Sequence, residues 1–273
     1  MIKPASDQVM KKTTASKIIE FFLKNIYFMG AKICSFFGIS FSFSSDGEDY
    51  VLSKWLDGME KGIYIDIGAH RPIKGSNTFY FWLKGWRGVL VDPIPGNKIT
   101  WQLLRSGDLI YNCGVVPREK LGQSFYYYYF KNNSDNSTFD PKRVEFLEKN
   151  YNRKPTSKSK VELITVLDLM SRAEKSFGNI DEVHLLNIDT EGFEAEIMND
   201  FLLLGIKPWV VCAEDLGRLI DDKESELGLI MKAHNYRLVA KTFLSAIYIR
   251  ADIIQELPSQ ILRELTFCNS ETL

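Results

Sequence analysis

Carboxylate side chains recur directly after short apolar runs in this sequence, and their types and spacing suit ligand binding and proton transfer. Asp66 and Asp92 end the first two such runs. Asp189 and Glu191 follow a later run, and Glu214 follows the next one. A carboxylate can accept both hydroxyls of a ribose or take a proton from a reacting hydroxyl. The pattern therefore predicts a negatively charged site at which several chain segments meet.

The elements that must position these residues are predicted from the alternation of apolar runs and helical stretches after residue 62. The early runs are apolar throughout, as parallel strands covered on both faces are. Strand–helix alternation favours an open, doubly wound α/β sheet, whose ligands bind beyond the carboxyl ends of the strands. We therefore expect the carboxylates at one sheet edge. The predicted strands are 62–67, 88–91, 109–112, 184–188, 209–213, 237–240 and 246–250, and predicted helices include 77–84 and 192–204.

The turn after the first predicted strand has the composition of a small-ligand cradle. In Asp66-Ile67-Gly68-Ala69-His70 an acid ends the strand and a glycine follows two residues later. Gly68 would let the backbone approach a ligand closely, and the turn can expose backbone N–H groups. Such turns also occur for structural reasons alone. Together with Asp92 at the end of the second strand, the turn predicts binding of a ribose-containing ligand.

With these and further motifs, the sequence resembles the FkbM-type S-adenosylmethionine-dependent methyltransferases over residues 45–250. The resemblance implies a class I methyltransferase (Rossmann-like) fold, with a seven-stranded, mostly parallel sheet and helices on both faces. It also implies S-adenosyl-L-methionine as cofactor and O-methylation, often of a hydroxyl of a sugar, glycan or glycosylated natural product. The motifs that carry it are Gly47-Glu48-Asp49, Asp66-Ile67-Gly68-Ala69-His70, Ser76-Asn77-Thr78, Gly85-Trp86-Arg87-Gly88 before Asp92-Pro93, and Ile188-Asp189-Thr190-Glu191-Gly192-Phe193-Glu194.

The resemblance further implies roles for single residues at this edge. One position departs from the family pattern: His70 stands where many methyltransferases have a second glycine, and its imidazole would line the cleft. No transition metal is expected, because His and Cys at metal-ligand spacing are missing. The implied contacts are Asp66, Gly68 and Ala69 with the methionine end of the cofactor, Asn77 and Thr78 with its carboxylate, Asp92 with its ribose, Asn112 and Cys113 with its adenine, and Asp189 and Glu191 with the methyl group and the acceptor hydroxyl.

Residues 117–160 interrupt the alternation with a long connection after the third predicted strand. They contain the aromatic run 125–130 and then a basic run. Long connections in compact domains are usually functional or disordered. Aromatic rings stack on sugar faces and cations pair with anionic groups, so we expect an acceptor site; a solvated surface loop is the alternative. The expected acceptor contacts are Tyr127, Arg153 and Lys154, together with Glu214 after the fifth predicted strand.

Residues 1–44 are expected to form an arm before a methyltransferase domain that spans 45–273. Apolar residues at steps of three and four within 17–43 predict an amphipathic helix. Charged residues interrupt them, so neither a membrane-spanning helix nor a signal peptide is expected. Residues 1–40 carry six lysines and two acids. The helix is expected either to pack on its own domain or a second subunit, or to lie on a membrane surface.

The composition argues against several other classes. The 273 residues include 34 basic and 35 acidic ones, so no nucleic-acid partner is expected. Four scattered cysteines favour a reducing, cytoplasmic location. A dehydrogenase on a related fold would need G-x-G-x-x-G after the first strand, and the segment 68–73 does not provide it. That class and an inactive methyltransferase-like binding protein are the alternatives to an active O-methyltransferase.

Overall fold

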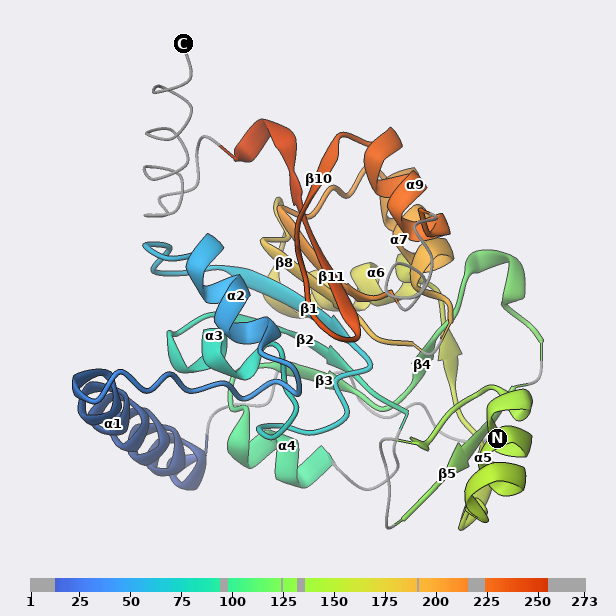
Figure 1. Cartoon of the computed structure of the whole chain (residues 1–273), viewed down its shortest axis with the longest axis horizontal. Helices are drawn as coiled ribbons and strands as arrows, with labels where there is room; N and C mark the ends of the chain where they lie inside the picture. The colour runs from blue at the N-terminus through green and yellow to red at the C-terminus, as the bar shows by residue number, and fades with distance from the viewer. Residues whose placement is uncertain are drawn as a thin grey trace.

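A seven-stranded sheet forms the centre of the molecule in the computed structural model, which describes residues 13–93, 98–123, 125–131, 136–190, 192–215 and 224–254. The strand order is β3-β2-β1-β8-β9-β11-β10 (Figure 1). β11 is antiparallel to both neighbours, and the remaining pairs are parallel. This is the class I methyltransferase fold, as predicted. The strands are β1 (Ile63–Ile67), β2 (Arg87–Val91), β3 (Leu109–Tyr111), β8 (Leu185–Ile188), β9 (Val210–Glu214), β10 (Tyr236–Lys241) and β11 (Ser245–Arg250).

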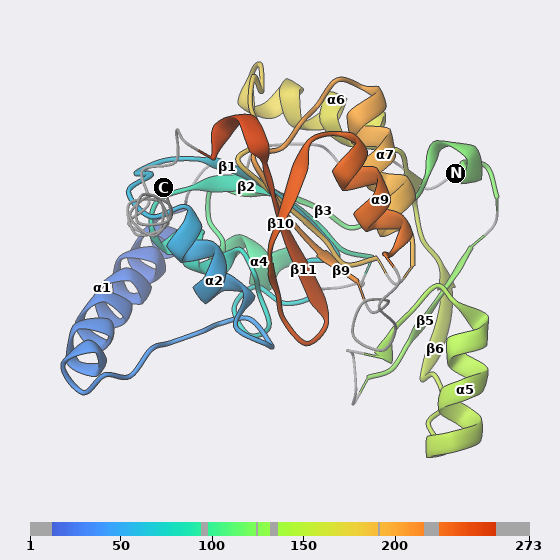
Figure 2. The ribbon, with the colours of Figure 1, turned by 45° about the horizontal axis from the view of Figure 1, so that its top comes forward.

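Helices cover both faces of the sheet, which makes the domain a three-layer structure (Figures 1 and 2). One face carries α6, α7 and α9, and the other carries α2, α3 and α4. The predicted helices 77–84 and 192–204 are present as α3 and α7, each slightly shorter than expected. The bounds are α2 (Glu48–Trp55), α3 (Phe79–Leu83), α4 (Lys98–Leu104), α6 (Val166–Phe177), α7 (Glu194–Leu203) and α9 (Glu226–Ala233).

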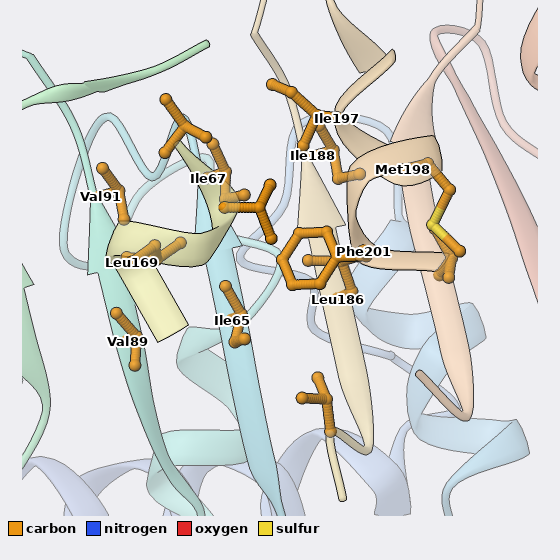
Figure 3. Packing of buried hydrophobic residues seen from close by; sticks show 14 of the residues in the cluster. Ile65, Ile67, Val89, Val91, Leu169, Leu186, Ile188, Ile197, Met198 and Phe201 are labelled. Carbon is orange, nitrogen blue, oxygen red and sulfur yellow. The ribbon is translucent and has the colours of Figure 1, made fainter. Parts of the chain in front are cut away.

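The apolar runs of the central strands are explained by burial on both faces. Ile65 and Ile67 of β1 pack toward α6 and its Leu169 (Figure 3). The alternate residue Tyr64 points to the opposite face, where it packs in a second cluster with Trp82 of α3. All five side chains are at most 1% exposed. Because successive residues of a strand face opposite sides, a strand covered on both faces is apolar at most positions, and a buried polar side chain such as Asp66 of β1 needs hydrogen-bond partners.

The helix α1 (Thr14–Phe36) precedes the domain and packs on it through a polar contact. The Glu20 carboxylate accepts hydrogen bonds from Arg87 Nη2 at 2.7 Å, from Ser106 Oγ at 2.7 Å and from Lys24 Nζ at 2.9 Å. Tyr27, two turns along the helix, contacts the ring of Tyr80 on α3. The expectation that this helix packs on its own domain is met at its inward face.

The connection 117–160 forms a small substructure beside the sheet edge at which the parallel strands end. β5 (Tyr126–Tyr129) pairs antiparallel with β6 (Ser157–Lys160), and α5 (Pro141–Tyr151) lies between them in sequence. In Figures 1 and 2 this substructure and α1 lie at opposite ends of the molecule. The remaining elements are β4 (Gly114–Val115) paired with β7 (Leu163–Ile164), and the short helices η1 (Arg118–Lys120) and η3 (Ala251–Ile253).

Candidate active site

A cavity of about 590 Å³ opens at the carboxyl ends of β1, β2, β8 and β9. In doubly wound sheets this edge is where ligands bind. One wall comes from residues 137–139 and Tyr127 of the connection, and another from residues 42–45, between α1 and α2. The sequence-predicted residues that line the cavity are Asp66, Gly68, Ala69, His70, Asn77, Asp92, Cys113, Tyr127, Asp189 and Glu214.

The turn after β1 is held against β2 by its backbone. The N–H groups of Gly68 and Ala69 both donate to the carbonyl oxygen of Val91, at 2.9 and 3.1 Å. The N–H of His70 donates to Asp92 Oδ2 at 2.8 Å. His70 has φ 48°, a left-handed conformation. His70, which stands where many methyltransferases have a glycine, thus adopts a backbone conformation that glycine adopts readily. This conformation directs the His70 N–H toward the Asp92 carboxylate.

Gly68 is required by close packing between the ends of β1 and β8. It has φ +86°, and a Cβ added there would lie 1.8 Å from the carbonyl oxygen of Asp189. The Asp189 N–H also donates to the Ile67 carbonyl at 2.9 Å. The glycine predicted to admit a ligand therefore also lets Asp189 approach the β1 turn.

We predict that Gly68→Ala lowers the free energy of unfolding by about 2–4 kcal/mol, because overpacking at Asp189 adds to the cost of a left-handed alanine. The matched control is Gly205→Ala. Gly205 has φ +78°, and no atom of the described residues lies within 4 Å of its added Cβ, so only the conformational cost of about 1 kcal/mol applies. Urea unfolding measures both variants. Equal losses would show that the strand ends accommodate the extra carbon.

Asp66 lies at the centre of a buried hydrogen-bond chain that ends at the cavity. Its Oδ2 accepts from Thr78 Oγ1 at 2.6 Å and its Oδ1 accepts from Asn187 Nδ2 at 2.9 Å. Asn187 Oδ1 in turn accepts from Asn77 Nδ2 at 2.8 Å, and Asn77 faces the cavity. Burial raises the pKa of the Asp66 carboxyl, and the Thr78 hydroxyl and nearby Arg105 oppose that rise. Asp66 therefore fixes the orientation of the cavity-lining amides.

Behind this chain, Arg105 is fully buried and all five of its N–H groups have acceptors. Nε donates to Asp108 Oδ2 at 3.0 Å, and Nη2 donates to the Thr78 and Tyr64 hydroxyls at 3.0 and 2.9 Å. Nη1 donates to the Pro72 carbonyl and to Ser76 Oγ, both at 3.2 Å. The guanidinium thus connects the α4–β3 region with the residues that hold Asp66.

The turn after β8 places Asp189 at the cavity with an exposed side chain. The carboxylate of Glu194, the last residue of the predicted motif, accepts from the N–H groups of Thr190 at 2.8 Å and Gly192 at 3.1 Å. Glu194 therefore shapes this turn. Glu191 lies outside the described residues.

Glu214, at the end of β9, also lines the cavity. Burial raises its pKa, as does the nearby Glu194 carboxylate, while Arg143 and Lys241 oppose the rise. A carboxylate whose pKa moves toward neutrality is better suited to accept a proton. Asp189 and Glu214 are thus the two described candidates for proton transfer at this edge.

Four sequence-predicted contacts take other positions. Thr78 is fully buried behind the cavity, where it supports Asp66 instead of facing a ligand. Asn112 is exposed outside the lining, with Nδ2 3.4 Å from the Asp92 carbonyl oxygen. Lys154 Nζ pairs with Glu148 on α5 at 2.9 Å, and the Arg153 guanidinium lies over the Tyr151 ring. Neither basic residue lines the cavity, because both follow the C-terminal end of α5, whereas the first turn of this helix borders the cavity.

Among the described residues of the connection, the cation that lines the cavity is Arg143, on the first turn of α5. Its position follows from the packing of α5 through Val144 and Leu147, which are buried three residues apart. That apolar pair is the sequence signal that marks the inward face of α5. Other lining residues without a sequence prediction include Ser42, Arg71, Lys74, Thr138, Phe139 and Thr190.

The Gly47-Glu48-Asp49 motif fixes the segment before α2 that forms one cavity wall. Asp49 is buried, and its carboxylate accepts from Ser42 Oγ at 2.6 Å, from the Phe43 N–H at 2.7 Å and from Ser44 Oγ at 2.9 Å. Since Ser42, Phe43 and Ser44 line the cavity, the motif contributes to the site by shaping its wall.

Comparison with known proteins identifies one family. The family model described as the methyltransferase FkbM domain matches residues 66–238, more than half of the chain. No curated protein is significantly similar. A solved structure of the O-methyltransferase from Bacillus cereus in complex with SAH is similar at 12% identity over 89% of this chain and 93% of that chain, with a TM-score of 0.34.

Proposed function

Because the chain belongs to the FkbM methyltransferase family, we propose that it is an S-adenosyl-L-methionine-dependent O-methyltransferase that acts on a hydroxyl of a sugar, glycan or glycosylated natural product. The observation that carries the proposal is the Asp92 carboxylate at the tip of β2. It is 7% exposed, lines the cavity and is oriented by the His70 N–H. An acid in this place accepts the ribose diol in nucleotide-binding folds.

The residues at the cavity fit such a cofactor. The volume of about 590 Å³ lies within the usual range of small-molecule sites. Asp92 would hold the ribose, the turn at Gly68 and Ala69 the amino-acid end, and Cys113 would lie against the base. When bound, S-adenosylmethionine supplies an electrophilic methyl group. Asn77, held by Asn187 and Asp66, would orient the amino-acid end from the other side.

The chain's own contribution to the reaction is positioning and proton acceptance. A sugar hydroxyl that attacks a methyl carbon must lose its proton, and Asp189 Oδ1 or Oδ2 would accept it. Glu214 and the rings of Tyr127 and Phe139 border the same cavity and would hold the acceptor in line. Orientation of this kind is a major source of rate acceleration.

Calorimetric titration with S-adenosylmethionine and with NAD tests the cofactor. We expect binding of the first alone. Asp92→Ala should weaken it about 10–150-fold, the loss of a charge-assisted hydrogen bond worth about 1.5–3 kcal/mol. Asp252→Ala, at an exposed pair with Arg250, is the control. Unchanged affinity in Asp92→Ala would overturn the ribose assignment, and binding without turnover on a panel of glycans would favour an inactive binding protein.

Arg143 supports a proposal about the acceptor's chemistry, because it borders two depressions. Besides the main cavity it lines an outer depression formed by Lys142, Phe146, Tyr151 and other residues of α5 and its flanks. Cations beside exposed rings suit a sugar that carries a phosphate or carboxylate. We propose that an anionic acceptor extends from the cavity across the first turn of α5.

Arg143→Gln is therefore expected to raise the acceptor KM about 10-fold or more, as for the loss of a charge-assisted hydrogen bond. The effect should shrink with rising salt. Arg153→Gln is the matched control: the residue lies on the same depression but outside the main cavity, and a change below about threefold is expected. Steady-state kinetics with a uronate- or phosphate-bearing acceptor measures both. If both substitutions changed the acceptor KM equally, the proposal that the acceptor occupies the main cavity beside Arg143 would be contradicted.

A further inference from the structure

One face of α1 presents a continuous row of large apolar side chains to solvent. The row follows steps of three and four residues, so its members share one side of the helix. Their exposed fractions range from 51% for Ile18 to 85% for Phe36. We call this row the α1 stripe: Ile18, Phe22, Ile26, Met29, Ile33 and Phe36.

The opposite face of α1 fixes the helix so that the stripe cannot turn inward. Glu20 is buried in its contacts with Arg87 and Ser106, and Leu23 and Tyr27 pack against the second core cluster. Rotating the helix would break these hydrogen bonds and take the Glu20 carboxylate away from Arg87 and from buried Ser106, which is costly. The α1 stripe is therefore a stable surface feature of the folded domain.

The apolar surface continues beyond the helix and carries positive charge. Phe37, Ile39 and Phe41 are 69%, 55% and 47% exposed. Lys17 and Lys32 are exposed on α1, and the helix's single acid, Glu20, faces the domain. Basic residues beside an apolar face are typical of helices that lie in a membrane interface.

We propose that α1 binds the surface of an anionic lipid bilayer, with the α1 stripe in the acyl-chain boundary and Lys17 and Lys32 at the headgroups. Among the described residues, no helix is long and apolar enough to cross a membrane. In the proposed mode α1 lies along the surface, as amphipathic helices do. A second copy of the chain fits this surface less well. The exposed α1 lysines of the two copies would repel each other across the interface, and α1 has no exposed acid that could pair with them.

The arrangement of the molecule suits this mode of binding. α1 and α5 lie at opposite ends of the molecule in two views (Figures 1 and 2). Docking through the α1 stripe therefore leaves the depression over α5 accessible. The proposal does not depend on the reaction, since it rests on residues outside the cavity.

Co-sedimentation of the full chain with vesicles tests the proposal. We expect binding to vesicles that contain phosphatidylglycerol, weaker binding to phosphatidylcholine alone, and weakening with added salt. The triple variant Phe22→Ser, Met29→Ser and Phe36→Ser should reduce the partition coefficient at least about 10-fold. The matched control replaces Leu167, Leu203 and Leu229 with Ser; these leucines are 56%, 74% and 55% exposed on other helices, and we expect wild-type binding.

A second pair of substitutions separates the charge from the apolar stripe. Lys17→Gln with Lys32→Gln should remove the preference for phosphatidylglycerol and retain weak binding to neutral vesicles. No vesicle binding by the wild-type chain, or equal binding by the stripe variant, would overturn the proposal. A lipid-free dimer that dissociates in the stripe variant, without vesicle binding in either, would assign the surface to a second copy instead.

Discussion

Replacing Arg105 with methionine is expected to lower the free energy of unfolding by about 3–5 kcal/mol, because it breaks a fully buried ion pair by removing one partner. Arg105 and Asp108 are both 0% exposed at their side chains. Without the guanidinium, Asp108 would retain bonds from the Tyr64 hydroxyl and the Gly88 N–H but would carry an uncompensated charge. Thr78 would lose the donor that orients its hydroxyl toward Asp66.

The pH dependence of this variant identifies the cause. Burial already raises the pKa of Asp108, and Arg105 opposes the rise, so its removal raises that pKa further. A carboxyl with a raised folded-state pKa contributes stability below its unfolded pKa, which is lost as pH rises. The stability deficit of Arg105→Met should therefore shrink as pH falls from about 7 toward about 4.

Chemical denaturation across this pH range measures the effect, with Arg172→Met as the control. Arg172 forms a partly exposed pair with Glu162 at 2.6 Å, and surface pairs contribute about 0–1 kcal/mol. A similar loss in both variants, or a deficit for Arg105→Met that is independent of pH, would show that burial of the charge pair is not what stabilises this region.

The strands and the sheet edge at which the cavity lies could be predicted, because strands buried on both faces produce recognisable apolar runs in the sequence. β1 and β2 are covered on both faces, so residues 63–65 and 88–91 form uncharged, mostly apolar runs that lead to Asp66 and Asp92. Parallel register brings the strand ends together, since Ile67 pairs with both Val91 and Ile188. No side-chain contact was needed for that inference.

The supporting network could not be predicted, because its members are distant in sequence and polar residues lack a periodic signal. The Arg105 guanidinium donates hydrogen bonds to Tyr64, which lies 41 residues earlier in the sequence, and to Thr78, which lies 27 residues earlier. Asn187 reaches Asp66 across 121 residues from within an apolar strand. The basic residues of the connection illustrate the same limit: which of them faces the cavity depends on the rotation of α5, and composition alone does not specify it.

Asp189→Asn is expected to lower kcat about 10²–10⁴-fold with little change in cofactor affinity, because it would remove the proposed proton acceptor and retain the shape of the side chain. The backbone of Asp189 is held by its bond to Ile67 and by contact with Gly68, so the substitution should not move the turn. Cofactor affinity is expected to persist, since the proposed ribose contact is with Asp92 and not with Asp189.

Glu214→Gln is the discriminating comparison, because Glu214 lines the same cavity and has a pKa raised by burial. If Asp189 accepts the proton, Glu214→Gln should act mainly on the acceptor KM and retain the acidic limb of the pH–kcat profile. If Glu214 accepts the proton instead, Glu214→Gln should cause the larger loss of kcat and should change the acidic limb of the pH–kcat profile. Single-turnover kinetics under saturating cofactor separates the two, since a residue that only orients the acceptor changes KM before it changes the chemical step.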